Sequence, residues 1–109
     1  MAIDKRVQAL AEPVAAAIPA CVGHLGRWKK AVVDQRIALA HGLGQSGLST
    51  HQLRQMSSLN QSLHWMLTLR LLLEAGVDGA VLSAATEQSE RFKNQRRNWI
   101  YCWPRVFQS

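Results

Sequence analysis

The stretch LRQMSSLNQSLHWMLTLRLLLEAG (residues 53–76) decides how this chain folds. Its apolar residues recur at spacings of three and four, which is the period of an amphipathic α-helix. Ser49 and Gln52 have the spacing of a capping box at a helix N-terminus, and Gly76 can end the helix. The poor helix formers SSLNQS (57–62) interrupt the pattern, so the stretch predicts either one long helix or two helices joined by a turn.

The C-terminal part of this stretch is strongly apolar. Between Leu63 and Leu73, eight of eleven residues are apolar. We therefore expect this segment to be buried on most of its circumference, either inside the fold or in a homodimer interface. The polar side chains Gln61, His64 and Thr68 follow helical spacing and form a narrow stripe. Any functional surface on this helix must be that stripe.

The rest of the chain predicts a single, mainly α-helical, small domain that spans residues 1–109. With 109 residues and 48% hydrophobic side chains, the chain can bury one modest core. A second periodic segment, HLGRWKKAVVDQRIALAHGLG (24–44), predicts an amphipathic helix that ends before a loop. Asp78 is placed to cap a further helix toward Glu90. Pro13 would have to lie at a kink or at the start of a new turn.

The last twenty residues, ERFKNQRRNWIYCWPRVFQS (90–109), are both basic and aromatic. The segment NWIYCW (98–103) allows a short C-terminal β element, an extended arm or the last turn of a helix, and Pro104 stops any helix there. One alternative for the rings is a surface that stacks on single-stranded nucleic acid. A small domain cannot easily leave several rings in water, so we expect most of the large apolar side chains to pack on the core: Phe92, Trp99, Ile100, Trp103 and Phe107.

The charge balance is the strongest bulk signal of function. The chain carries 13 Lys and Arg against 7 Asp and Glu, a formal net charge of +6. Such an excess attracts polyanions at long range, so the expected partner is nucleic acid, either DNA or RNA, or an acidic protein surface. The candidate cations lie on the polar face of the predicted 24–44 helix and in the basic tail: Arg27, Lys29, Lys30, Arg36, Arg91, Lys93, Arg96 and Arg97.

Residues 36–77 also resemble a known motif. The matching elements are Leu48 and Ser49, Gln52 and Leu53, Leu59, Asn60 to Ser62, and LLLEAGV at 71–77. In this order they resemble the helix-turn-helix core of winged-helix transcriptional regulators, particularly the arsenic-repressor and MarR-like groups. The resemblance covers under half of the chain.

The resemblance implies a DNA-binding regulator with a turn within residues 57–62 and a wing from residues 89–103. It would place four polar side chains against base edges in the major groove: Asn60, Gln61, His64 and Thr68. It would place four tail cations on phosphates or in the minor groove: Arg91, Lys93, Arg96 and Arg97. The chain lacks the metal-sensing cysteine or histidine clusters of the arsenic-repressor group, so no metal response is implied.

No residue cluster indicates catalysis or a metal. The four histidines are scattered, and Cys21 and Cys102 belong to no CxxC pair, so we expect neither a metal site nor a cofactor. The carboxylates are dispersed, and GLGQSG (42–47) lacks the lysine of a phosphate-binding loop, so we do not expect an enzyme. Two reduced, buried thiols suit a cytoplasmic protein, with one disulfide as the alternative. No apolar run is long enough to predict a membrane span.

Two function classes therefore follow from the sequence. The first is a small, basic, non-enzymatic nucleic-acid-binding protein that contacts the phosphate backbone, with helix-turn-helix readout as its specific form. The alternative is a helical protein-binding subunit or inhibitor, of the kind found in phages, mobile elements or nucleoprotein complexes. In that case the basic faces would dock on an acidic partner.

Overall fold

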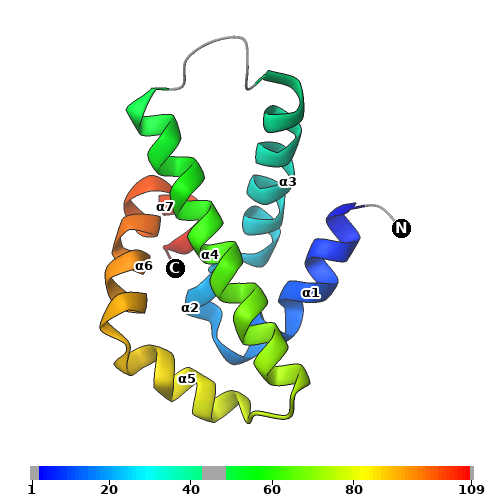
Figure 1. The fold of residues 1–109 in the computed structure, drawn as a ribbon, viewed down its shortest axis with the longest axis vertical. Coiled ribbons are helices and arrows are strands. Elements are labelled where there is room, and N and C mark those ends of the chain that lie inside the picture. Colours follow the sequence, from blue (N-terminus) through cyan, green and yellow to red (C-terminus); the bar gives the residue numbers. More distant parts are fainter. Residues whose placement is uncertain (1–2, 43–48, 109) are drawn as a thin grey trace.

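Helices make up all the regular structure of the chain in this computed structural model, which describes residues 3–42 and 49–108 (Figure 1). The expectation of a mainly α fold is therefore confirmed. The predicted loop before Ser49 lies largely outside the described residues. In chain order the helices are α1 (Ile3–Ala17), α2 (Pro19–Val22), α3 (Leu25–Gly42), α4 (Thr50–Glu74), α5 (Gly79–Gln88), α6 (Glu90–Cys102) and α7 (Pro104–Phe107).

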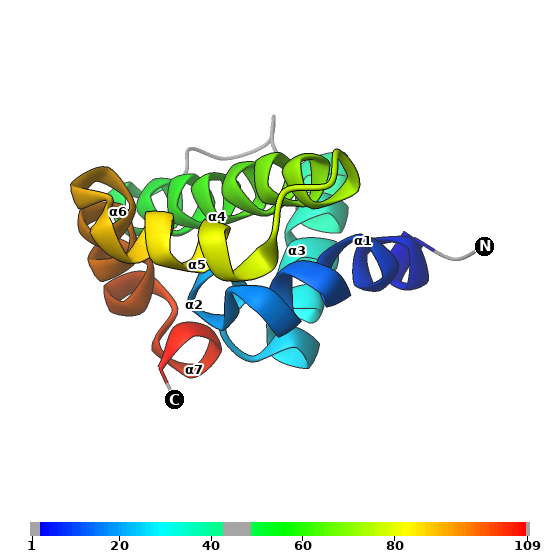
Figure 2. The ribbon, with the colours of Figure 1, turned by 90° about the horizontal axis from the view of Figure 1, so that it is seen from below.

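Helix α4 is the central element of the arrangement. In Figure 1 it crosses the molecule diagonally, between α6 on one side and α3 and α1 on the other. Seen from below in Figure 2, α4 runs along one side of the molecule, with the short α2 beneath it. It packs against α1, α2, α3 and α6. The position of α4 therefore determines which surfaces of the other helices are covered.

Helix α4 is continuous from Thr50 to Glu74, through the serine-rich segment 57–62. It begins with the predicted capping box: the Ser49 hydroxyl accepts from the Gln52 amide, and the Gln52 side chain accepts from the Ser49 amide. The alternative of two helices joined by a turn at 57–62 is therefore wrong, and the turn of a helix-turn-helix is not formed there.

Tertiary contacts explain why this segment is helical despite its poor propensity. Ser58 and Ser62, one turn apart, are both fully buried. The Ser62 hydroxyl accepts from the Trp28 indole at 2.9 Å and donates to the Cys21 carbonyl at 2.7 Å. The Asn98 amide donates to the Ser58 hydroxyl at 3.1 Å. The two small side chains let neighbouring helices approach closely and satisfy their polar groups, which offsets the propensity cost.

The C-terminal half of α4 is less enclosed than its composition predicts. Met66 and Leu69 are buried, but Leu67, Leu71 and Leu72 are 41%, 70% and 38% exposed. Burial of most of the circumference within the fold is therefore wrong, because no other described helix covers this outer face.

The tail is helical and closes the core. Ser89 ends α5 and caps α6 through its hydroxyl, which accepts from the Phe92 amide. The segment 98–103 forms the last turns of α6 and its cap, so neither a β element nor a wing is present there, because the rings pack as one helical face. The Phe92 ring lies edge-on to Trp65 and to Trp99, with centroids 5.0 and 5.6 Å away. The expectation that most tail rings pack on the core is confirmed, and Tyr101, at 70% exposure, is the exception.

A glycine sets the contact between α7 and the α2–α3 connection. Gly23 has a φ of 63°, which L side chains rarely adopt. A Cβ placed there would lie 2.1 Å from the Val106 carbonyl oxygen. The same carbonyl accepts from the His24 amide at 2.7 Å, so the two backbones are held together at this point.

Ser62→Ala should lower the free energy of unfolding by about 1–3 kcal/mol, because it leaves the buried Trp28 indole N–H without an acceptor. Ser57→Ala, in the same helix but exposed, is the control and should change stability by about 0.5 kcal/mol or less. Chemical denaturation followed by tryptophan fluorescence measures both. Equal effects of the two substitutions would show that the buried hydrogen bond is unimportant.

Gly23→Ala should destabilise the fold by about 2–4 kcal/mol, because both the backbone conformation and the contact with α7 oppose a Cβ. Gly26→Ala is the control: its Cβ would meet only the His24 side chain at 3.4 Å. Thermal unfolding monitored by circular dichroism compares them. A Gly23→Ala variant as stable as Gly26→Ala would refute the close approach of α7.

Candidate functional site

A groove between α4 and α6 gathers the polar stripe that the sequence predicts. Asn60, Gln61, His64 and Thr68 of α4 line it together with Arg91 of α6. Its apolar lining comes from Leu53, Met56 and Trp65. We call this hollow the α4–α6 groove. The structure thus brings five of the predicted site residues together, although α4 is one helix and not the two expected for a helix-turn-helix.

The polar groups of the groove divide into two sets. Gln61 accepts from the Trp99 indole at 3.0 Å, and Gln95 accepts from the Trp65 indole at 2.6 Å, so both glutamines hold the core together. By contrast, the side chains of a second set make no hydrogen bond or ion pair with any other described residue, and all four are exposed: Asn60, His64, Thr68 and Arg91. These four are available to a ligand.

A second hollow lies on the opposite flank of α6, against α2 and α5. Lys93, Arg96 and Arg97 line it, and Glu87 is the one carboxylate in its lining. We call it the basic hollow. Arg96 is held in place by a hydrogen bond of 3.3 Å from its Nε to the Ala20 carbonyl. The hollow therefore concentrates three of the four predicted tail cations at one place.

The partners of the two exposed cations in the basic hollow are weak. Lys93 lies 3.4 Å from Glu90 in an exposed ion pair, and the Arg97 guanidinium donates to the Asn94 side chain at 3.2 Å. Exposed pairs of this kind contribute little free energy. Lys93 and Arg97 can therefore give up these contacts and turn toward an anion at a small cost in free energy.

The structure does not gather the four cations predicted on the 24–44 segment. Arg27 donates to the Arg105 carbonyl of α7, and Lys29 donates to Gln8 of α1. Lys30 pairs with Asp34 at 2.6 Å, and Arg36 lines a further hollow between α1, α3 and α4, which shares only Asn60 with the α4–α6 groove. These side chains point to different neighbours, so α3 does not present them as one patch.

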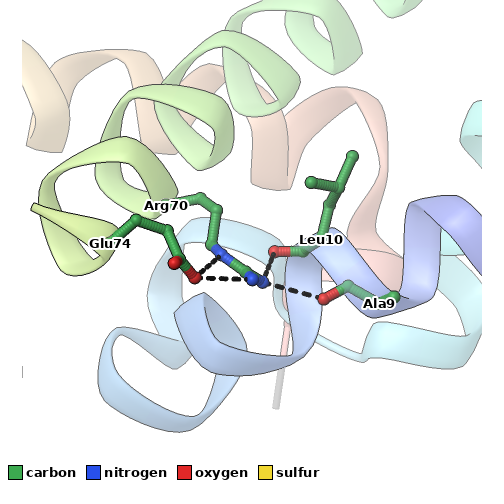
Figure 3. Close-up of polar contacts among 4 residues, drawn as sticks. All are labelled: Ala9, Leu10, Arg70 and Glu74. Carbon is green, nitrogen blue, oxygen red and sulfur yellow. Dashed lines mark hydrogen bonds and ion pairs between the residues drawn. The ribbon is translucent and has the colours of Figure 1, made fainter.

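Arg70 has a structural role that the sequence did not reveal (Figure 3). Pro13 lies inside α1 and has no N–H, so the Ala9 carbonyl lacks its donor within the helix. The Arg70 guanidinium donates to that carbonyl at 2.9 Å and to the Leu10 carbonyl at 3.2 Å, and pairs with Glu74 at 2.7 Å. Arg70 therefore joins α4 to α1 where the proline interrupts the backbone bonding.

The remaining reactive side chains form no further site among the described residues. Cys21 and Cys102 are buried and free, and burial raises the pKa of the Cys21 thiol to about 12. A thiol with so high a pKa stays neutral near pH 7 and is a poor nucleophile. Nowhere in 3–42 and 49–108 do three or more metal-ligating side chains come together, and none of the helices there combines the length and apolarity needed to cross a bilayer.

Comparison with known proteins gives no relative: no family model, curated protein or solved structure matches this chain. The resemblance to winged helix-turn-helix regulators therefore stays a prediction.

Arg70→Ala should cost less stability in a Pro13→Ala background than in the wild type, because alanine at position 13 restores a donor for the Ala9 carbonyl. We expect a coupling of about 0.5–1 kcal/mol in a double-mutant cycle measured by urea denaturation. Additive effects of the two substitutions would show that Arg70 does not act through the carbonyl freed by Pro13.

Proposed function

We propose that this protein binds nucleic acid, chiefly through contacts between the cations of α6 and backbone phosphates. The observation that carries the proposal is the convergence of Lys93, Arg96 and Arg97 on one hollow lined by a single carboxylate, Glu87. Guanidinium and ammonium groups grouped in this way favour phosphate. The net charge of +6 adds a long-range attraction to the same class of ligand.

The charges of α6 are distributed so that one ligand can touch both flanks of the helix. Arg91 and Lys93 are two residues apart, which turns them by about 200° around the helix axis. Arg91 accordingly lines the α4–α6 groove, whereas Lys93 lines the basic hollow. A polyanion that passes over the N-terminal half of α6 would meet cations on both sides.

A protein partner is the second candidate, and a separate observation favours it. Leu67, Leu71 and Leu72 are exposed on the outer face of α4. Contact with another protein, or with a second copy of this chain, would bury this apolar surface. The basic flanks of α6 would then meet acidic side chains at the rim of that interface. The two candidates predict opposite outcomes for the binding of nucleic acid by the purified protein alone.

Replacing Lys93 and Arg97 together by glutamine should weaken nucleic-acid binding and make it less sensitive to salt. Each phosphate contact contributes about 0.7–0.9 to the slope of log affinity against log salt, so we expect the slope to fall by about 1.5. Fluorescence anisotropy with random-sequence DNA and RNA, from about 50 to 200 mM salt, measures this change. Arg96 is left intact because it also binds the Ala20 carbonyl.

The matched control removes the same charge from exposed sites on α1 and α3, as Arg6→Gln with Lys30→Gln. The control should retain most of the affinity and most of the salt slope. Equal losses in the two double variants would mean that diffuse charge, and not the basic hollow, attracts the ligand. Absence of any binding by the wild type at low salt would refute the proposal and favour the protein partner.

A further inference from the structure

We infer that the α4–α6 groove receives the unpaired bases of a single strand, so that the preferred ligand is single-stranded nucleic acid. This inference rests on the proposed function and specifies the class of nucleic acid. It is carried by the combination of free polar groups, apolar lining and one cation within a single hollow.

The shape of the site argues against reading a duplex. The free polar groups Asn60, His64 and Thr68 line a hollow between α4 and α6, two helices that pack side by side (Figure 1). Two packed helices measure about 20 Å across, because their axes lie about 8–10 Å apart and each helix is about 10 Å wide. The major groove of DNA is about 12 Å wide and admits one helix. The α4–α6 pair is therefore too broad to enter it.

The free groups suit base edges presented one after another. Asn60, His64 and Thr68 follow each other at four-residue intervals, so they line one side of α4 about 6 Å apart along its axis. Among them they offer an amide, an imidazole and a hydroxyl, which together can donate and accept hydrogen bonds. Unstacked bases expose their Watson–Crick edges to such groups, whereas paired bases do not.

The apolar lining provides contact for the faces of the bases. Leu53, which is 52% exposed, lines one part of the groove, and Met56 and Trp65 line it further along α4. The orientation of Trp65 is set by its hydrogen bond to Gln95 and by its edge contact with Phe92. A half-buried ring held in this way can contact a base without first having to be ordered.

Charge connects the groove to the proposed phosphate site. Arg91 lies in the groove with no acidic partner among the described residues, so it is available to a phosphate. A strand that leaves the groove past Arg91 crosses α6 and reaches Lys93 and Arg97 on the other flank. An unpaired strand can bend over a single helix in this way, whereas a short duplex is too stiff to do so.

The test compares single strands with duplexes of the same sequence. A labelled mixed-sequence oligonucleotide of about 15 nucleotides, as DNA and as RNA, is titrated with the full chain by anisotropy at low salt. We expect the single strands to bind at least about tenfold more tightly than their duplexes. The triple variant Asn60→Ala, His64→Ala and Thr68→Ala should lower single-strand affinity by about tenfold and leave the salt slope unchanged, because no charge contact is lost.

The control is Gln88→Ala, an exposed polar side chain at the end of α5 and outside the groove, which should bind as the wild type does. Unfolding curves of all variants exclude loss of the fold as the cause. Equal or tighter binding of duplex, or a triple variant that binds single strands normally, would overturn this inference alone. Polyglutamate of the same charge and length carries no bases. If it displaced the strand at equal concentration, charge alone would explain binding, and the inference would be overturned. Failure of every nucleic acid to bind would overturn the proposed function as well.

Discussion

The hydrogen bonds of the four tryptophan indoles tie α4 to the rest of the structure. Trp28 donates to Ser62, Trp99 to Gln61 and Trp103 to the Gln55 carbonyl, and all three acceptors lie on α4. Trp65, on α4 itself, donates to Gln95 of α6. A buried indole N–H without an acceptor is costly, so these bonds set where α4 lies relative to α3 and α6. The α4–α6 groove exists because of that placement.

The polar residues of α4 serve two purposes on two faces. Ser58 and Ser62 face inward, where their small size and hydroxyl groups permit close packing. Asn60, His64 and Thr68 form an outer set: they are exposed along the α4–α6 groove and have no partner among the described residues. Because the two sets lie on different sides of one helix, substitutions in the outer set can change binding with little effect on the fold. This separation allows the candidate site to be tested directly.

Helical spacing predicted which residues of α4 share the face of the candidate site. It could not predict which of them are free and which bond to other helices. The spacing of Gln61, His64 and Thr68 predicted a stripe, which the groove contains, because residues three and four apart share a face of any helix. Gln61 belongs to the same stripe but is not free to bind a ligand, because it accepts a hydrogen bond from Trp99, a residue 38 positions away. Arg70 is a similar case, since its role follows from the missing N–H of Pro13 on another helix.

Local periodicity, local hydrogen bonding and hydrophobicity were enough to predict the mainly helical class, the capping box at Ser49, the cap at Asp78 and the packing of most tail rings. Contacts with residues distant in the chain were needed to establish that SSLNQS (57–62) is helix and not turn. Local propensity favours a break there, whereas the buried bonds of Ser58 and Ser62 to distant residues stabilise the helix. The tertiary structure also separated the basic residues into the basic hollow, the groove and isolated positions, because charge along a chain does not specify which side chains meet in space.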